Sequence, residues 1–422
     1  MPQDIKNQEP IRRSTWKEFV FQIFISVEGP NIFVIPALFK QIGILVGIVA
    51  SVVVGLFYTN AMHSYLKCAN EMSRRRNVPQ QSLYKLPQMV FEEISCPRIG
   101  HYIKLYLKYE IIISWCLGLS LQWQFIVENL KLILSYYQYT PDNVHILACL
   151  LLPLILISWI PSLKYIDYVS YIVTFSIFLV TGVIVYLLVW HTPEYATFEV
   201  IVPVNLASLV TFTSYMFIML SFTPLVFPLK NTMKNPESLS KTFGPLTLVI
   251  AAMIVLNCAI TVLVYVEIGD DVEENLFENF SHTPLVLATN CFFALLAMAS
   301  ISPSLLVIIM AFWNDGLENH LCDSKYTKLY EYLVRSSICV FITLGVILVP
   351  SFTNLINLIT CFSFPFDSIM LPAVLEIVLA WSDSKKRCTR EFKLICVKNT
   401  IIGVFSLAVI VLSLIVCVGN FT

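Results

Sequence analysis

The sequence predicts an all-α membrane protein with eleven transmembrane helices. Three observations support this prediction: the composition, the length of the apolar runs and the distribution of basic residues. Of the 422 residues, 57% are hydrophobic and 13% are charged, and the mean hydropathy is +0.76. Soluble domains carry about 25% charged residues. The excess of apolar side chains therefore indicates a surface that contacts lipid.

Eleven apolar runs are long enough to cross a bilayer, whose core of about 30 Å needs about 20 helical residues. A backbone in lipid must satisfy its own hydrogen bonds, so the runs are predicted to be helices. The sequence thus divides into a polar N-terminal tail, residues 1–18, without features of a cleavable signal peptide, and one transmembrane domain, residues 19–419. The predicted spans are residues 19–39, 43–66, 109–127, 144–160, 167–190, 206–228, 244–266, 285–312, 333–350, 354–380 and 395–419.

The basic residues lie almost entirely on one side of this arrangement. Of the 27 Lys and Arg residues, all except Lys40 and Lys131 fall in the tail or in loops that follow even-numbered spans. Lys and Arg collect in cytosolic loops. The pattern predicts a cytosolic N-terminus and an extracellular or lumenal C-terminus, because an error of one span would exchange the sides of all later loops.

The loop at residues 267–284 is predicted to face outward, and it contains six acidic and no basic residues. Within it, Asn279-Phe280-Ser281 is a glycosylation sequon, which makes Asn279 a candidate acceptor. The 12 Cys lie mostly in apolar runs or basic loops. Their positions indicate reduced thiols, with neither a disulfide framework nor the spacing of metal ligands.

Two spans contain residues that interrupt helices. The first has Glu28-Gly29-Pro30-Asn31 near its middle, and the sixth has Ser221-Phe222-Thr223-Pro224. Proline removes a backbone donor and disfavours helix at the preceding residue. Carriers built from inverted repeats place their solute site between such broken helices. An ordinary proline kink is the alternative for either span, but the matching positions favour a carrier.

Several short segments, in order along the chain, also match a known pattern. Residues 227–236 read FPLKNTMKNP, residues 266–271 read VEIGDD, and residues 35–43 read IPALFKQIG after Gly29. Residues 66–69 and 371–376 end the second and tenth spans with LKCA and LPAVLE. From about residue 19 to residue 415 the chain resembles the proton-coupled amino-acid transporter family of the amino acid/auxin permease group.

The resemblance implies a five-plus-five inverted repeat of the LeuT-like type, within the APC superfamily, plus one extra helix. It also implies transport of small neutral amino acids. The family's solute meets backbone that is unwound in the first and sixth spans, where half-helix N-termini attract carboxylates and freed carbonyls attract ammonium groups. By position, the substrate-binding candidates are Gly29, Pro30, Asn31, Ser221, Phe222 and Thr223.

The chain departs from the family pattern at the implied site. The family's Gly-Thr-Gly is Gly29-Pro30-Asn31 here, and the next glycine is Val34. Glycine lets a backbone approach a ligand closely, so a smaller or differently shaped pocket is expected. Acidic positions of the family in and after the sixth span are occupied by Ser221 and Lys230.

Proton coupling by the family's usual histidines is not expected, because Gln22 and Asn60 stand at those positions. Ionisable groups at membrane depth are the replacement candidates, namely Glu28, His63 and Asp367. For Glu28 and His63 the competing interpretation is a hydrogen-bonded structural role. Two other acidic residues are expected towards the membrane interfaces, Glu110 and Glu376.

Two functions remain open on this scaffold. A secondary transporter for small amino acids, with H⁺ as a coupling ion and no cofactor, is the first. A transport-deficient amino-acid sensor is the second. A membrane enzyme is not predicted, since the sequence has no nucleophile elbow, metal-ligand set or phosphate-binding glycine loop. The expected partners are small amino acids and the lipid bilayer of the plasma membrane or a lysosomal or vacuolar membrane, with no nucleic acid.

Overall fold

The computed structural model describes residues 14–77, 82–159, 163–191, 205–273, 275–280, 283–317, 326–348, 362–383, 387 and 389–419. In these residues the regular structure is helical, and the one β-type contact is an isolated bridge between Ser14 and Met233. The helical segments, in chain order, are α1 (Trp16–Lys40), α2 (Ile44–Arg76), α3 (Lys85–Glu92), α4 (Pro97–Tyr136), α5 (Asn143–Ser158), α6 (Leu163–His191), α7 (Leu206–Met219), α8 (Thr223–Thr232), η1 (Pro236–Ser240), α9 (Pro245–Ile268), η2 (Gly269–Asp271), η3 (Leu276–Asn279), α10 (Pro284–Ala299), α11 (Ile301–Ile309), η4 (Met310–Leu317), α13 (Thr327–Leu348), η5 (Phe366–Met370), α15 (Leu371–Ser382) and α16 (Arg390–Gly419).

The predicted all-α membrane architecture is confirmed. Within the described residues, nine helices or joined helical segments are long and apolar enough to cross a membrane. These nine do not include α1 or α5. Helix α5 has 16 residues, which at about 1.5 Å per residue reach about 24 Å, less than the bilayer core of about 30 Å. Eleven crossings and the inverted repeat therefore stay predictions.

Helix α1 begins inside the segment predicted as a tail. Its N-cap is Thr15, and Thr15 and Glu18 form a capping box: the Glu18 amide donates to Thr15 Oγ1 and the Thr15 amide donates to Glu18 Oε2 (2.6 Å). This arrangement satisfies two donors that the helix start leaves unpaired. Just before the cap, the Ser14 amide donates to the Thr232 carbonyl (2.8 Å) and the Lys234 amide donates to the Ser14 carbonyl (2.9 Å).

The expected unwinding of the first span is not found. The backbone of α1 is helical from Trp16 to Lys40, through residues 29–31. A proline inside a helix costs one hydrogen bond and a contact with the preceding turn. Helices often accommodate a proline by bending instead of breaking. The presence of Pro30 was therefore not enough to predict an unwound backbone. The side chains of Gly29, Pro30 and Asn31 lie outside the described part of the structure.

The expected interruption of the sixth span is found. Helix α7 ends at Met219 and α8 begins at Thr223. Between them, the Phe222 amide donates to the Leu220 carbonyl (2.8 Å) and the Leu225 amide donates to the Phe222 carbonyl (3.0 Å). These bonds form tight turns instead of a continuous helix. We call residues 220–222 the break.

Two later spans contain π-helical turns that the sequence did not reveal. They are η4, which follows α11, and η5, which precedes α15. A π-helical turn inserts one residue into a helix, disturbs its hydrogen-bond ladder and often occurs at functional sites. Helix η5 includes Asp367, one of the predicted proton-coupling candidates.

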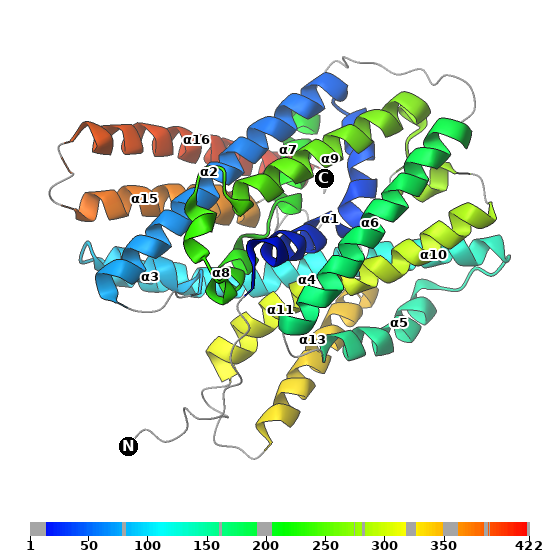
Figure 1. Cartoon of the computed structure of the whole chain (residues 1–422), viewed down its shortest axis with the longest axis horizontal. Coiled ribbons are helices and arrows are strands. Elements are labelled where there is room, and N and C mark those ends of the chain that lie inside the picture. The colour runs from blue at the N-terminus through cyan, green and yellow to red at the C-terminus, as the bar shows by residue number, and fades with distance from the viewer. Residues whose placement is uncertain are drawn as a thin grey trace.

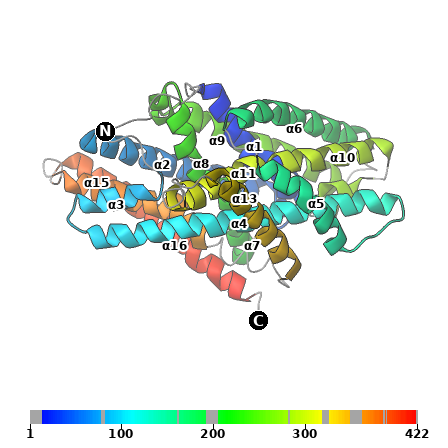
Figure 2. The ribbon, with the colours of Figure 1, turned by 90° about the horizontal axis from the view of Figure 1, so that it is seen from below.

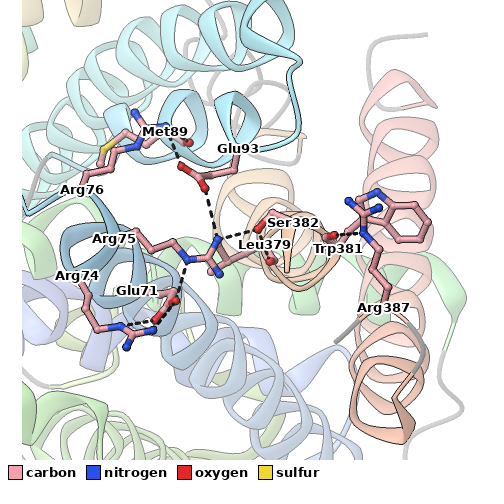
Figure 3. A network of polar contacts seen from close by, with 10 residues as sticks. All are labelled: Glu71, Arg74, Arg75, Arg76, Met89, Glu93, Leu379, Trp381, Ser382 and Arg387. Carbon is pink, nitrogen blue, oxygen red and sulfur yellow. Dashed lines mark hydrogen bonds and ion pairs between the residues drawn. The ribbon is translucent and has the colours of Figure 1, made fainter. Parts of the chain in front are cut away.

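The helices pack into one bundle around a common apolar core (Figure 1). Helices α3 and α4 run alongside one another, as do α15 and α16 (Figures 1 and 2), and α15 also packs against α2. At one end of the bundle, the C-terminal turn of α2 is tied to its neighbours by arginines (Figure 3). Arg75 bonds to Glu71 (2.8 Å) and Ser382 (2.9 Å), and Arg76 bonds to the Met89 carbonyl (2.8 Å).

Candidate solute and proton site

The break is held by a tyrosine from α2. Tyr58 is fully buried, and its hydroxyl accepts a hydrogen bond from the Phe222 amide (3.2 Å). The same hydroxyl lies 3.0 Å from Thr223 Oγ1, and the rings of Tyr58 and Phe222 meet edge to face with centroids 5.3 Å apart. Buried backbone donors need a partner. The Tyr58 hydroxyl gives the Phe222 amide a second acceptor beside the Leu220 carbonyl.

The break also faces the π-helical turn of the tenth span. Thr223 Oγ1 lies 3.5 Å from Ser368 Oγ, and Ser368 is the neighbour of Asp367 in η5. The Tyr65 hydroxyl donates to the Asp367 carbonyl (2.5 Å). Tyr58 and Tyr65 are seven residues apart on α2, which places them on the same face of the helix. One face of α2 therefore contacts both the break and η5.

Of the predicted substrate-binding residues, the structure brings Phe222 and Thr223 together with Tyr58, and both are buried. Ser221 is half-buried, and its amide donates to the Ile218 carbonyl (3.2 Å). The N-terminus of α8 lies at Thr223. Helix N-termini present free amides and a partial positive charge, so this end of α8 suits a carboxylate.

The predicted proton-coupling residues occupy three separate places. Glu28 is completely buried between α1 and α9, where its Oε1 accepts from Asn257 Nδ2 (2.7 Å); its Oε2 has no hydrogen-bond partner among the described residues. His63 is half-buried, and its Nε2 lies 2.9 Å from Thr247 Oγ1 on α9, away from the break.

Asp367 forms a pair with Glu110 inside the bundle, and the depth of Glu110 in the membrane stays a prediction. Glu110 is 8% exposed and Asp367 is 7% exposed. The two carboxyl groups are within hydrogen-bonding reach of one another, and Ser114 and Ser363 also bond to Glu110. Helix α4 has 40 residues, about 60 Å, which is longer than a bilayer core of about 30 Å. A residue in its early turns can therefore lie deep in the bundle.

Glu376 is also buried, and its surroundings are basic. Lys67 Nζ lies 2.9 Å from its Oε1, and Lys398 Nζ lies 2.7 Å from its Oε2. Ser64 and Asn399 donate to the same Oε2 at 2.8 and 3.0 Å. Two ammonium groups favour the ionised carboxylate, so this site joins α2, α15 and α16 as an ion-pair cluster and is not suited to exchange a proton.

A small pocket adjoins α8 on the side of its two prolines. Its volume is about 80 Å³, and no charged side chain lines it. The lining combines α4, α8, the end of α11 and the residues before α3: Ser82, Leu83, Tyr84, Ile111, Pro224, Pro228, Asn231, Val307, Met310 and Ala311.

The predicted glycosylation acceptor lies in an ordered loop. Asn279 Nδ2 donates to the Asp271 carbonyl (2.7 Å), and Asn279 Oδ1 accepts from the Glu273 amide (3.0 Å). Ser281 of the sequon lies outside the described residues. Glycosylation thus remains a prediction, and a sugar on Asn279 would replace the amide contact with Asp271.

The fold is that of a secondary transporter. The structure resembles that solved as "Substrate-bound outward-open state of a Na+-coupled sialic acid symporter reveals a novel Na+-site", with a TM-score of 0.56 and 12% sequence identity. The match covers 96% of this chain and 90% of the other, and at this identity it shows the fold alone.

The chain belongs to the family described as "Transmembrane amino acid transporter protein", which matches residues 12–417. It is also similar to the "Proton-coupled amino acid transporter-like protein pathetic" of Drosophila melanogaster, with 24% identity over 368 residues that cover 84% of this chain and 74% of the relative. The family resemblance found in the sequence is confirmed. The chain is a multi-pass membrane transporter and not an enzyme.

Proposed function

We propose that this protein is a secondary transporter that moves small neutral amino acids by alternating access at α1 and the break. The observation that supports the proposal most directly is the interrupted backbone between α7 and α8, where Thr223 begins a new buried helix. The solute carboxylate would bind at the amides of this helix start, and the Thr223 hydroxyl would donate to it. On α1, the proposal assigns solute binding to Gly29, Pro30 and Asn31.

The surroundings of α8 favour a small, uncharged side chain on the solute. The pocket beside Pro224 and Pro228 has a volume of about 80 Å³ and an uncharged lining. A cationic or anionic side chain would enter it without a counter-charge, which is costly in an apolar environment. The proposal therefore excludes lysine, arginine, aspartate and glutamate as preferred solutes.

The proposal also fixes an orientation, with the N-terminus cytosolic and the C-terminus extracellular or lumenal, in the plasma membrane or a lysosomal or vacuolar membrane. It rests on the asymmetry of the basic residues. Loss of a glycosidase-sensitive mass shift in Asn279→Gln would support an outer position for the loop. Modification of a cysteine introduced at Lys234 by an impermeant reagent applied from outside would contradict the orientation.

The transport proposal is tested by counterflow in proteoliposomes loaded with single unlabelled amino acids. Trapping of labelled glycine, alanine or proline is expected, and Thr223→Val should reduce it at least tenfold. The matched control is Thr213→Val in α7, since the Thr213 hydroxyl donates to the Leu209 carbonyl (2.7 Å) within its own helix. Folded protein that exchanges no amino acid at any pH would refute the proposal.

One observation favours the alternative, a sensor that binds an amino acid without moving it. The helical backbone of α1 through residues 29–31 frees only the carbonyl that Pro30 cannot bond, whereas an unwound segment would free several. A thermal shift with glycine, alanine or proline, in protein that shows no counterflow, would support the sensor.

A further inference from the structure

The proton-coupling element of the proposed transporter can be sought among its buried acids. Glu28 bonds to an asparagine on α9, and Glu376 is paired with two lysines. Glu110 and Asp367 differ from both, because their carboxyl groups interact with one another and, in the part of the chain that the structure describes, neither forms an ion pair with a lysine or arginine. The sequence separates them by more than half the chain, so only the fold reveals the pair.

Two buried carboxyl groups within hydrogen-bonding reach of one another cannot both be charged without a cation between them. Like charges repel most strongly where water is excluded, and one of two paired acids then keeps its proton. If both are ionised, Glu110 Oε1 and Asp367 Oδ1 have no hydrogen-bond donor among the described residues. One proton between the carboxyl groups removes the repulsion and supplies a donor. The two carboxyl groups together are therefore suited to hold a single proton.

Among the groups gathered here, the two carboxyl groups of the pair are the candidates for exchanging a proton with water. Tyr65 of α2 faces Asp367 and donates its proton to the Asp367 carbonyl, while Tyr106 of α4 lies on the other side. Phenols ionise only well above neutral pH. From α16, the Ser406 hydroxyl donates to the Pro365 carbonyl (2.8 Å), and it does not titrate. Cys68 and the Tyr58 phenol are the other titratable groups that act on Tyr65.

The pair is also connected to the break. Ser368, the residue after Asp367, lies 3.5 Å from Thr223 Oγ1, and Tyr58 and Tyr65 attach the same face of α2 to both segments. Helix η5 is a π-helical turn bounded by Pro365 and Pro372. Irregular turns of this kind can change their hydrogen bonding without unfolding the helix. Movement of α8 during solute binding would thus displace the segment that holds Asp367 against Glu110.

We propose that Glu110 and Asp367 share one proton and form the proton-coupling site of this transporter. Water on the loading side donates a proton to the ionised pair, and the new O–H bond joins the two carboxyl groups. When η5 moves, the pair separates, the O–H bond breaks, and the proton passes to water on the other side. The inference rests on the proposed amino-acid transport, and it assigns the coupling to a pair on α4 and η5.

The first experiment does not depend on transport. Infrared difference spectra of the purified full chain are recorded between acidic and alkaline pH, to follow the band of a buried protonated carboxyl. Both Glu110→Gln and Asp367→Asn are expected to lose one band, because an amide can donate to the remaining carboxylate without a proton. Spectra in which both variants keep every wild-type band would overturn the inference.

The second experiment measures coupling in proteoliposomes with an inward gradient of one pH unit. A transporter that moves one proton with each solute accumulates it up to about tenfold, since one pH unit and a tenfold concentration ratio are equal in free energy. Glu110→Gln and Asp367→Asn should fall to a ratio of one, with counterflow serving as the check on folding. Loss of accumulation in Glu28→Gln, with both pair variants still accumulating, would assign the proton to Glu28 and overturn the inference.

Two further cases are covered: amide variants that do not fold, and a wild-type protein that exchanges no amino acid. If the amide variants do not fold, Glu110→Asp and Asp367→Glu retain the carboxyl groups. A change in the pH at which the band disappears then supports the pair, and an unchanged pH overturns it. If the wild-type protein exchanges no amino acid, the proposed transport fails, but the infrared result still decides whether the two residues share a proton.

Discussion

Removing the charge of Glu376 provides a sharp test of how the ends of the helices are held together. In Glu376→Gln the side chain keeps its shape but loses its negative charge and one acceptor oxygen. The wild-type carboxylate is 4% exposed and receives hydrogen bonds from Ser64 and Asn399, in addition to its two lysines. The variant therefore tests a contact between α2, α15 and α16.

The magnitude follows from the exposure of each partner. The side chains of Lys67 and Lys398 are 62% and 40% exposed, so water screens both ion pairs, and each is worth about 0.5–1 kcal/mol. Hydrogen bonds to a buried charged acceptor are worth about 1.5–3 kcal/mol, and the amide keeps part of them. Together these terms predict a loss of about 3 kcal/mol in the free energy of unfolding.

The matched control is Glu71→Gln, at the same end of α2. Glu71 pairs with Arg74 and Arg75, but its side chain is 27% exposed, so its loss should cost less than about 1 kcal/mol (Figure 3). Unfolding of both variants is followed by denaturant titration in detergent micelles at low and high salt. Equal stability of the two variants would refute the reasoning, as would a cost for Glu376→Gln that salt abolishes.

Three other changes have expected outcomes. Tyr58→Phe should destabilise the protein by about 1–3 kcal/mol in the same titration and slow counterflow, because it removes the buried hydroxyl that contacts both Thr223 Oγ1 and the Phe222 amide; the exposed Tyr102→Phe should do neither. Gly244→Ala should lower the yield of folded protein in size-exclusion chromatography, since the new Cβ would lie 2.3 Å from a carbonyl oxygen, whereas Gly118→Ala meets nothing within 4 Å. A hydrogen bond from an arginine of α2 lowers the pKa of Glu92 in α3. Its stabilising effect is therefore present above the ordinary carboxyl pKa of 4.5 and is lost as the pH falls through the lowered value. Hydrogen exchange in α3, corrected for the intrinsic rate, should rise in acid, and Glu92→Gln should remove that dependence; a variant with the wild-type dependence would contradict the assignment.

The sequence predicted the features that depend on local composition. Apolar length identifies helices in a membrane, and the Ser221–Pro224 segment predicted where the sixth span breaks. The same argument failed for Pro30, because one missing backbone donor is compatible with either a bend or a break, and neighbouring helices decide between them. Local residues indicate where a helix is weak, and packing determines whether it opens.

The site depended more on contacts between distant segments. Nothing in the sequence indicated that Glu110 pairs with Asp367, which lies in a different span. Tyr58 and Tyr65 are seven residues apart on one helix face, which is a signal that could have marked them, but their partners in the sixth and tenth spans come only from the fold. Charge patterns likewise could not show that Glu376 is surrounded by two lysines from separate helices.

The short bridge between Ser14 and Met233 links the movement of α1 to that of α8. Its two bonds join main-chain atoms on both sides of Met233 to Ser14, next to the first turn of α1. A tilt of α8 would pull directly on the start of α1, so the two helices proposed to enclose the solute would move together. Because side chains contribute nothing to these two bonds, most substitutions leave the linkage intact. Proline at position 14 or 234 would remove a donor and cut one bond.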